Sequence, residues 1–154
     1  MAVNANQLSL TSESLGIPSF NMHGFKNGLA MLSEICLNHR FNTITVQEHW
    51  LHRSMLNSFN VVYNEFEHFA IFDMNNASSS GISRGRPFGD ICFLWRKSIA
   101  KCIKIVNCDP NGRCVALSIR VANQIILIVS VYFPNFDCSA TYKVELGLDL
   151  FKIL

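Results

Sequence analysis

Three polar side chains lie where apolar, strand-like stretches of the sequence end. Asn21 ends the stretch in SFNMHG, Glu48 follows the one in TVQEHWL, and Tyr132 ends the one in VSVYFPN. Strand ends of one sheet lie at the same rim, so residues distant in sequence can converge there. Taken singly, each has a plain interpretation: a turn residue, a solvated carboxylate and a core tyrosine with a wet hydroxyl. Taken together, they predict a chemical site at a sheet rim.

The elements that must position these residues alternate between strand and helix. Leu29, Leu32, Ile35 and Cys36 recur at three-and-four spacing, which predicts a helix over 26–40. Alternation and apolar runs predict the strands, and Ser, Gly and Asn crowded together predict a long loop. The expected strands are 17–22, 42–47, 60–66, 91–96 with an extension to 106, 113–121 and 124–133, with a helical turn at 50–59, the loop at 73–90 and a helix at 139–154.

This order predicts an α/β layered protein with a mixed, mainly antiparallel sheet and flanking helices. The turns at 110–112 and around Asn123 are expected to be hairpins. At 154 residues the chain suits one domain, which we assign to 17–154, after a frayed segment at 1–16.

Composition excludes several classes of protein. The chain is 49% hydrophobic and carries a net charge of +2, too small to identify a nucleic-acid binder by charge alone. Six cysteines without a CxxC pair predict free thiols in a reducing compartment. The first residues do not resemble a signal peptide, and the longest apolar run, 125–133, is about half the length that spans a bilayer. We expect an intracellular protein of the nucleus or cytoplasm, not secreted and without a membrane partner.

Four stretches carry a resemblance to a known family: SFNMHGFKNGLAMLSEI, TVQEHWL, GRPFGDICFLWRKSIA and VSVYFPNFD. In this order they resemble the endonuclease/exonuclease/phosphatase superfamily, which includes apurinic endonucleases and the endonuclease domains of non-LTR (LINE-type) retrotransposons. The pair QEHWL and GRPFG is most similar to the retrotransposon branch. The chain departs from the family at Asp90, where a small residue is usual. The resemblance implies part of a four-layer α/β sandwich.

The resemblance also implies roles for individual residues. Glu48 would bind Mg²⁺ or Mn²⁺, with Asn21 helping to hold the metal and phosphate region, and Tyr132 would contact the scissile phosphate of DNA. Mg²⁺ typically takes one or two protein carboxylates, with water and phosphate completing its shell. Asn135, in the YFPNFD stretch, is a further candidate DNA contact.

Other patterns carry weaker signals. Arg84 and Arg86, in the glycine-rich loop, could touch a DNA backbone or lie in solvent. His49 and His52 have HxxH spacing, but further ligands for a zinc site are not spaced to complete it.

Part of the family's machinery does not follow Tyr132. The family uses a GDxN element and a terminal Asp-His pair, and neither occurs in the 22 residues after Tyr132. The DxN triplets that begin at Asp73 and Asp109 precede Tyr132 and do not correspond. Loss of acid–base assistance alone costs about 10²–10⁴-fold in rate. We therefore expect the N-terminal half of an endonuclease domain, inactive as an isolated chain and binding metal weakly if at all.

Removal of a second half is also expected to uncover the inner face of the sheet and to promote self-association. Two alternatives remain open from the sequence. One is a non-catalytic remnant or interaction protein with the same half-fold. The other is a small-molecule phosphoesterase of the same superfamily, which the QEHWL and GRPFG pair disfavours.

Overall fold

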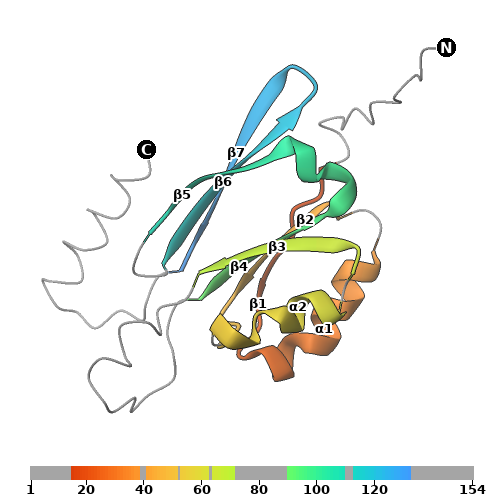
Figure 1. The fold of residues 1–154 in the computed structure, drawn as a ribbon, viewed down its shortest axis with the longest axis vertical. Coiled ribbons are helices and arrows are strands. Elements are labelled where there is room, and N and C mark those ends of the chain that lie inside the picture. The colour runs from red at the N-terminus through yellow and green to blue at the C-terminus, as the bar shows by residue number, and fades with distance from the viewer. Residues whose placement is uncertain are drawn as a thin grey trace, which may run out of the picture.

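The computed structural model describes residues 15–38, 41–51, 53–62, 64–71, 90–109 and 113–132. These residues form three layers, with helices on one face of a first sheet and a second sheet on its other face (Figure 1). The elements in chain order are β1 (Ser19–Asn21), α1 (Phe25–Leu37), β2 (Thr43–Gln47), the 3-10 helix η2 (Arg53–Met55), α2 (Asn57–Val62), β3 (Phe66–Ile71), β4 (Ile91–Arg96), the 3-10 helix η4 (Lys97–Cys102), β5 (Ile103–Cys108), β6 (Cys114–Val121) and β7 (Gln124–Val131).

The first sheet has the strand order β1-β2-β4-β3 and is mixed. β1 runs parallel to β2, whereas the β2–β4 and β4–β3 pairs are antiparallel. Alternate residues of the central strand β4 face opposite layers: Cys92 and Leu94 join the core under the helices, and Ile91 and Phe93 join the core between the sheets. A strand that is buried on both faces has a continuous apolar run in its sequence, which made this strand predictable. The prediction of a strand at 91–96 is confirmed.

The helix layer closes over the first sheet through one close approach. α1 buries Gly28, Leu32 and Cys36, which follow one another at four-residue intervals. At Gly28 an added Cβ would lie 2.8 Å from the Cβ of Met22, so a larger side chain would push the helix off the end of β1. α1 ends at Leu37, a turn before the predicted end of this helix at residue 40.

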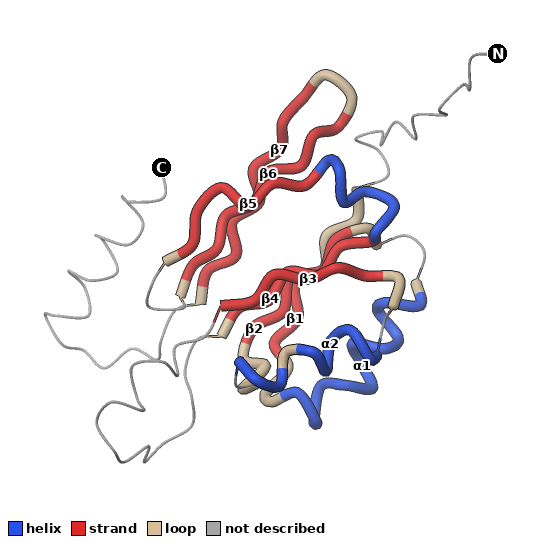
Figure 2. The backbone as a smooth tube through the Cα atoms, viewed as in Figure 1, coloured by secondary structure: helices blue, strands red, loops and turns tan. Residues whose placement is uncertain are grey.

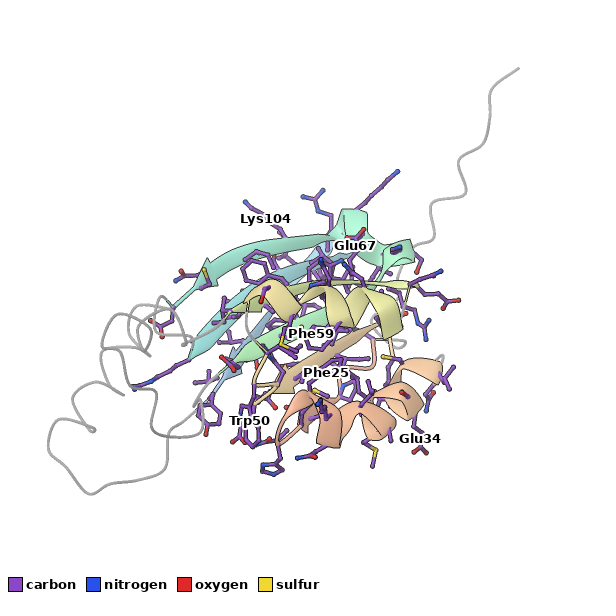
Figure 3. The ribbon with its side chains drawn as sticks, turned by 60° about the horizontal axis from the view of Figure 1, so that its bottom comes forward. Phe25, Glu34, Trp50, Phe59, Glu67 and Lys104 are labelled. Carbon is purple, nitrogen blue, oxygen red and sulfur yellow. The ribbon has the colours of Figure 1, made fainter. Side chains whose placement is uncertain are left out.

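The prediction of a strand at 60–66 is wrong. Those residues contain the end of α2, and the strand, β3, begins at Phe66 instead. Phe59 explains the helix, because its buried ring packs edge-to-face on Phe25 of α1 with centroids 5.1 Å apart (Figure 3). This tertiary contact outweighs the β propensity of Val61 and Val62.

The second sheet, β5-β6-β7, packs face to face against the first (Figure 2). Phe93 and Trp95 of β4 contact an apolar cluster that includes Leu117 and Ile119 of β6. The prediction that the inner face of the sheet is uncovered is therefore wrong, because the inner faces of the two sheets cover each other. The exposed apolar residues on the second sheet lie on its outer face, which alternates with the buried one: Val106, Ile125, Leu127 and Val129.

The extension of strand 91–96 as far as residue 106 is also wrong, because η4 interrupts it. η4 carries the chain from β4 in the first sheet to β5 in the second. The hairpin around Asn123 is confirmed: Val121 pairs with Gln124, and Ala122 takes a left-handed conformation at φ +49° in the two-residue turn.

Three expected features lie wholly or almost wholly outside the described residues, namely the frayed segment 1–16, of which only 15 and 16 are described, the loop 73–90, of which only 90 is described, and the helix 139–154. At the described start of the chain, Leu15 packs against the inter-sheet core and Gly16 forms an isolated bridge with Phe41. Within the described ranges, none of the helices has the length and apolar character needed to cross a membrane.

Candidate active site

The ends of β1 and β2 meet at one rim because the two strands are parallel neighbours. Asn21, the last residue of β1, pairs with Gln47, the last residue of β2, so the residues that follow leave the sheet together. Beyond the strands the backbone N–H of Gly24 donates to the carbonyl of Glu48 at 2.8 Å. We call the cluster of Asn21, His23, Glu48 and Tyr132 the rim site.

The backbone at the rim site is held in sparsely populated conformations. His23 has φ +48°, Glu48 has φ +54° and Asp90, opposite Glu48, has φ +53°. Left-handed φ values are uncommon for residues other than glycine, and they persist where the surroundings determine them. Here the N–H of Glu48 donates to the carbonyl of Asp90 at 3.0 Å, which fixes Glu48 between β1 and β4. Such strain often marks functional loops.

Gly24 completes this loop because a side chain would not fit. Its φ is +95°, and an added Cβ would lie 2.6 Å from the indole ring of Trp50. The close contact between Gly24 and Trp50 holds the loop after β1 against the loop after β2. The spacing of both loops therefore depends on the glycine in the SFNMHG motif.

His23 is a residue of the rim site that the sequence analysis did not assign. Its Nδ1 lies 3.1 Å from Oε2 of Glu48, with the imidazole largely exposed and the carboxylate 15% exposed. Its N–H donates to Oδ1 of Asn21 at 3.0 Å, and Asn27 Nδ2 donates to its carbonyl at 2.9 Å. The SFNMHG stretch of the sequence carries no sign of the contact between His23 and Glu48.

Tyr132 reaches the same carboxylate from the second sheet. Burial, a hydrogen bond with Glu48 and the negative charge of Glu48 raise the pKa of Tyr132 to about 12. The phenol therefore keeps its proton into the alkaline range, and it donates to the carboxylate. The N–H of Tyr132 donates to the carbonyl of Arg113 at 2.8 Å, which extends the β6–β7 pairing and anchors the residue just after β7. Glu48 thus links His23, on the first sheet, to Tyr132, on the second.

A polar seam beneath the rim site fixes the two sheets relative to each other. Thr45 Oγ1 donates to Ser130 Oγ at 2.6 Å, and Gln47 Nε2 donates to the same oxygen at 3.1 Å. Gln47 also hydrogen-bonds Ser19 of β1 at 3.1 Å. This seam joins β1, β2 and β7. Its residue in β7, Ser130, precedes Tyr132 by two positions. In the sequence, the polar positions of β2 that alternate with Ile44 and Val46 were the available signal for it.

His49 belongs to the core rather than to the rim site. It is fully buried, its Nδ1 accepts the N–H of Leu51 at 3.1 Å, and its ring lies edge-on to Phe59. Burial lowers the pKa of His49 to about 4, partly offset by a hydrogen bond to the backbone of Ile71. His49 is therefore a neutral core residue. Its HxxH partner, His52, lies outside the described residues.

The other candidate contacts are placed only in part. Arg84, Arg86 and Asn135 lie outside the described residues, as do Asp73 and the asparagine of the second DxN triplet. The aspartate of that triplet, Asp109, accepts the N–H of Arg113 through Oδ2 at 3.2 Å and closes the end of the β5–β6 hairpin. Asp90 is fully buried at the start of β4.

Two donors of the rim site, the carboxylate of Glu48 and the amide oxygen of Asn21, suit a hard divalent cation with few protein ligands. Over the part of the chain that the structure describes, no group of three or more His, Cys, Asp or Glu side chains could hold a metal ion. A cation here would need water or phosphate oxygens to complete its coordination.

Comparison with known proteins identifies the fold. No family model matches the chain, and no curated protein matches it. Among solved structures, the AP endonuclease LMAP from Leishmania major superposes with a TM-score of 0.53 and 11% sequence identity, over 75% of this chain. That enzyme has the endonuclease/exonuclease/phosphatase fold, and the two-sheet core with flanking helices described above is similar to it. The aligned region spans 39% of the length of the AP endonuclease.

Proposed function

We propose that the chain is the N-terminal part of a metal-dependent phosphodiesterase domain that cuts DNA, of the non-LTR retrotransposon type. One observation carries the proposal: Glu48 lies in contact with His23, beside Asn21, and also with Tyr132 of the other sheet. The QEHWL and GRPFG stretches support the retrotransposon branch. The fold of the AP endonuclease is consistent with a nuclease.

Mg²⁺ or Mn²⁺ would be held by Glu48, with Asn21 beside it. When bound, the cation would neutralise negative charge on the oxygens of the scissile phosphate. Asn21 is already oriented by the N–H of His23, and its oxygen retains a second lone pair.

Tyr132 would position the phosphate. A tyrosine hydroxyl with the ordinary pKa of 10 already keeps its proton at neutral pH, and the rise of the pKa of Tyr132 to about 12 extends its role as a donor to alkaline pH. When the carboxylate of Glu48 is engaged elsewhere, that proton can be donated to a phosphate oxygen instead. Hydrogen bonds from a neutral donor to a charged oxygen are among the stronger ones in proteins.

The test joins this chain to a complete second half from a related endonuclease domain and measures nicking of supercoiled plasmid with Mg²⁺. We expect nicking in the joined protein and loss of most of it in Glu48→Gln. Glu34→Gln, an exposed carboxylate on α1, serves as the matched control and should retain activity. Full activity in Glu48→Gln would exclude Glu48 as the metal ligand. Faster turnover of small phosphoesters than of DNA would favour a small-molecule phosphoesterase.

A second candidate is a non-catalytic interaction protein with the same fold. The observation that favours it is the exposed apolar outer face of the second sheet. In that case the joined protein would not cut DNA, and substitutions on the outer face would change its association while Glu48→Gln would not.

A further inference from the structure

A cleft of about 500 Å³ lies beside the rim site, between the start of α1 and the segment that follows β2, and we call it the Trp50 cleft. Trp50, Phe25, Leu29 and Met55 form its apolar wall. Among the described residues that line it, Lys26 is the one cation and none is acidic. We propose that the Trp50 cleft binds a nucleotide, with the base against the apolar wall and the phosphate beside Lys26. This inference rests on the proposed function, because it assigns the cleft to a base of the DNA strand that is cut.

The back of the Trp50 cleft is fixed by packing and backbone hydrogen bonds. The indole of Trp50 lies against Gly24, where an added Cβ would be 2.6 Å from the ring. The ring of Phe25 packs edge-to-face on the buried ring of Phe59, with centroids 5.1 Å apart (Figure 3). The N–H of Phe25 donates to the carbonyl of His49 at 2.8 Å. A preformed cleft of this volume with aromatic walls is of the kind that holds small organic ligands.

The side chains of the cleft suit a flat aromatic group that carries negative charge. Bases stack on aromatic side chains, and every base can do so because each has a π-face. Lys26 is exposed, so its ammonium group can contact a phosphate oxygen at the mouth of the cleft. Asn27 and Ser58 also line the cleft and offer polar atoms to the edge of a base. Asn27 Nδ2 carries two hydrogens, and its bond to the carbonyl of His23 uses one of them.

The position of the cleft relative to the rim site fits neighbouring nucleotides of one strand. Trp50 follows Glu48 by two residues, and two residues of chain span at most about 7 Å. Successive phosphates of a DNA strand advance about 3.4 Å along the helix axis. A base in the Trp50 cleft would therefore lie within about two nucleotides of a phosphate at Glu48. Gly24 connects the two places, because it lines the cleft and its N–H donates to the carbonyl of Glu48 at 2.8 Å.

A larger cleft on the second sheet separates the effect of stacking from that of charge. Its volume is about 680 Å³, and Lys101, Lys104 and Arg120 line it together with aliphatic side chains such as Ile125. None of the described residues that line it is aromatic. Lys104 lies well away from Trp50 (Figure 3). If charge alone held a nucleotide, this second cleft would hold it better than the Trp50 cleft.

The experiment uses the full chain without metal and measures nucleotide binding rather than nuclease activity. The chain is labelled with fluorotryptophan, so its two tryptophans, Trp50 and Trp95, give two fluorine NMR resonances. Trp50→Phe assigns them. The probes are deoxyadenosine monophosphate, deoxyadenosine and inorganic phosphate. Met55→Glu adds a carboxylate in the cleft at a position that is 47% exposed, and Met31→Glu is its matched control at 50% exposure on α1. Lys26→Gln is likewise matched by Lys104→Gln, in the other cleft.

We expect deoxyadenosine monophosphate to shift the Trp50 resonance and to leave that of the buried Trp95 in place. Deoxyadenosine should shift the same resonance with lower affinity, whereas phosphate alone should not shift it. Met55→Glu should weaken binding of the monophosphate by about tenfold, because two negative charges would face each other. Lys26→Gln should weaken it by about threefold and leave deoxyadenosine within about twofold. Both control variants should bind as the wild type does.

Two results would overturn the nucleotide site while leaving the proposed function intact. One is a Trp50 resonance that responds to phosphate as it does to the monophosphate, which would show that the aromatic wall plays no part. The other is a joined protein that nicks plasmid although millimolar monophosphate leaves the Trp50 resonance in place. Conversely, binding in the cleft together with a joined protein that does not nick would support the nucleotide site and overturn the proposed nuclease.

Discussion

The two sheets of this protein differ in how their faces are covered. The first sheet is buried on both sides, by α1 and α2 on one face and by the second sheet on the other, and its central strand β4 is almost wholly inaccessible (Figure 1). The second sheet shares that inner core but leaves apolar side chains on its outer face, among them Ile125 and Leu127. Within the described residues, both faces of the first sheet are therefore covered, whereas the second sheet has one face covered and one exposed.

The edges of the sheets show the same difference. β5, one edge of the second sheet, carries Lys104 and an irregular register between Ile105 and Asn107, both of which discourage pairing with another strand. β7, the other edge, has no charged residue and no proline over its eight residues. The rim site lies at the end of this edge strand of the described sheet, because Tyr132 directly follows β7. The difference between the sheets predicts a series of effects of decreasing size.

The largest effect is expected in the core that the two sheets share. Phe93 of β4 is fully buried there, so Phe93→Ala should lower the free energy of unfolding by about 3–5 kcal/mol. Urea denaturation monitored by circular dichroism measures it. Phe93→Leu, which keeps most of the volume, should cost clearly less. A loss below about 1 kcal/mol for Phe93→Ala would mean that the sheets do not pack as described.

Acid should destabilise the fold through His49, the buried histidine that packs on Phe59. Because burial lowers the pKa of His49 to about 4, the unfolded chain, with the ordinary value of 6.5, takes up a proton that the folded chain does not. Stability is thus full above about pH 6.5 and falls as the pH drops toward about 4. Burial lowers the pKa of His68 as well, in the same direction.

Between pH 7 and pH 5 we expect the free energy of unfolding to fall by about 2 kcal/mol from His49 alone. Urea midpoints across this range measure the slope. His49→Gln removes the titrating group, and its slope should be shallower than that of the wild type, whatever its absolute stability. An equal slope in both proteins would show that His49 is protonated equally in the folded and unfolded chains.

How well each strand can be predicted from the sequence depends on how fully that strand is buried. β2, β4, β6 and β7 were predicted nearly residue by residue, because their apolar runs are long and end at clear turns. β3 was missed, because Glu67 and His68 interrupt its apolar run and the residues before it looked more strand-like than helical. The division into two sheets was also missed. A 3-10 helix such as η4 leaves no periodic signal, and without it the strands appear to belong to one uncovered sheet.

The rim site, like the strands, could be predicted only in part. The ends of apolar strands located Asn21, Glu48 and Tyr132, and the structure brings all three to one rim. The contact of His23 with Glu48 could not be predicted, because it depends on a left-handed backbone that histidine adopts rarely. Ser130 was missed as well, since its partners Thr45 and Gln47 lie in the other sheet.

A smaller effect is expected at the polar seam between the sheets. Ser130→Ala removes the acceptor of the Thr45 hydroxyl, a buried hydrogen bond, and should cost about 1 kcal/mol of stability. It should also loosen Tyr132, two residues along, so the tyrosine ring resonance should shift in NMR spectra. As a control, Ser33→Ala removes a hydroxyl that bonds within α1 and should leave that resonance in place. An unchanged Tyr132 signal in Ser130→Ala would separate the seam from the rim site.

The smallest effect on folding, and the clearest on association, is expected on the open face of the second sheet. Leu127 is 49% exposed on that face and Met31 is 50% exposed on α1, so the two positions are matched in exposure and differ in location. Lysine at either position should change the free energy of unfolding by no more than about 0.5 kcal/mol, as for most surface substitutions. We expect the wild-type chain to self-associate through the outer face and the edge of β7, because exposed apolar area and an edge strand of the described sheet coincide there. In sedimentation velocity, Leu127→Lys should shift the chain toward monomer, since a charge on an edge strand opposes pairing, whereas Met31→Lys should sediment as the wild type does. Equal shifts in both variants would mean that added charge alone disperses the chain, and that the two sheets do not differ in what they present to a partner.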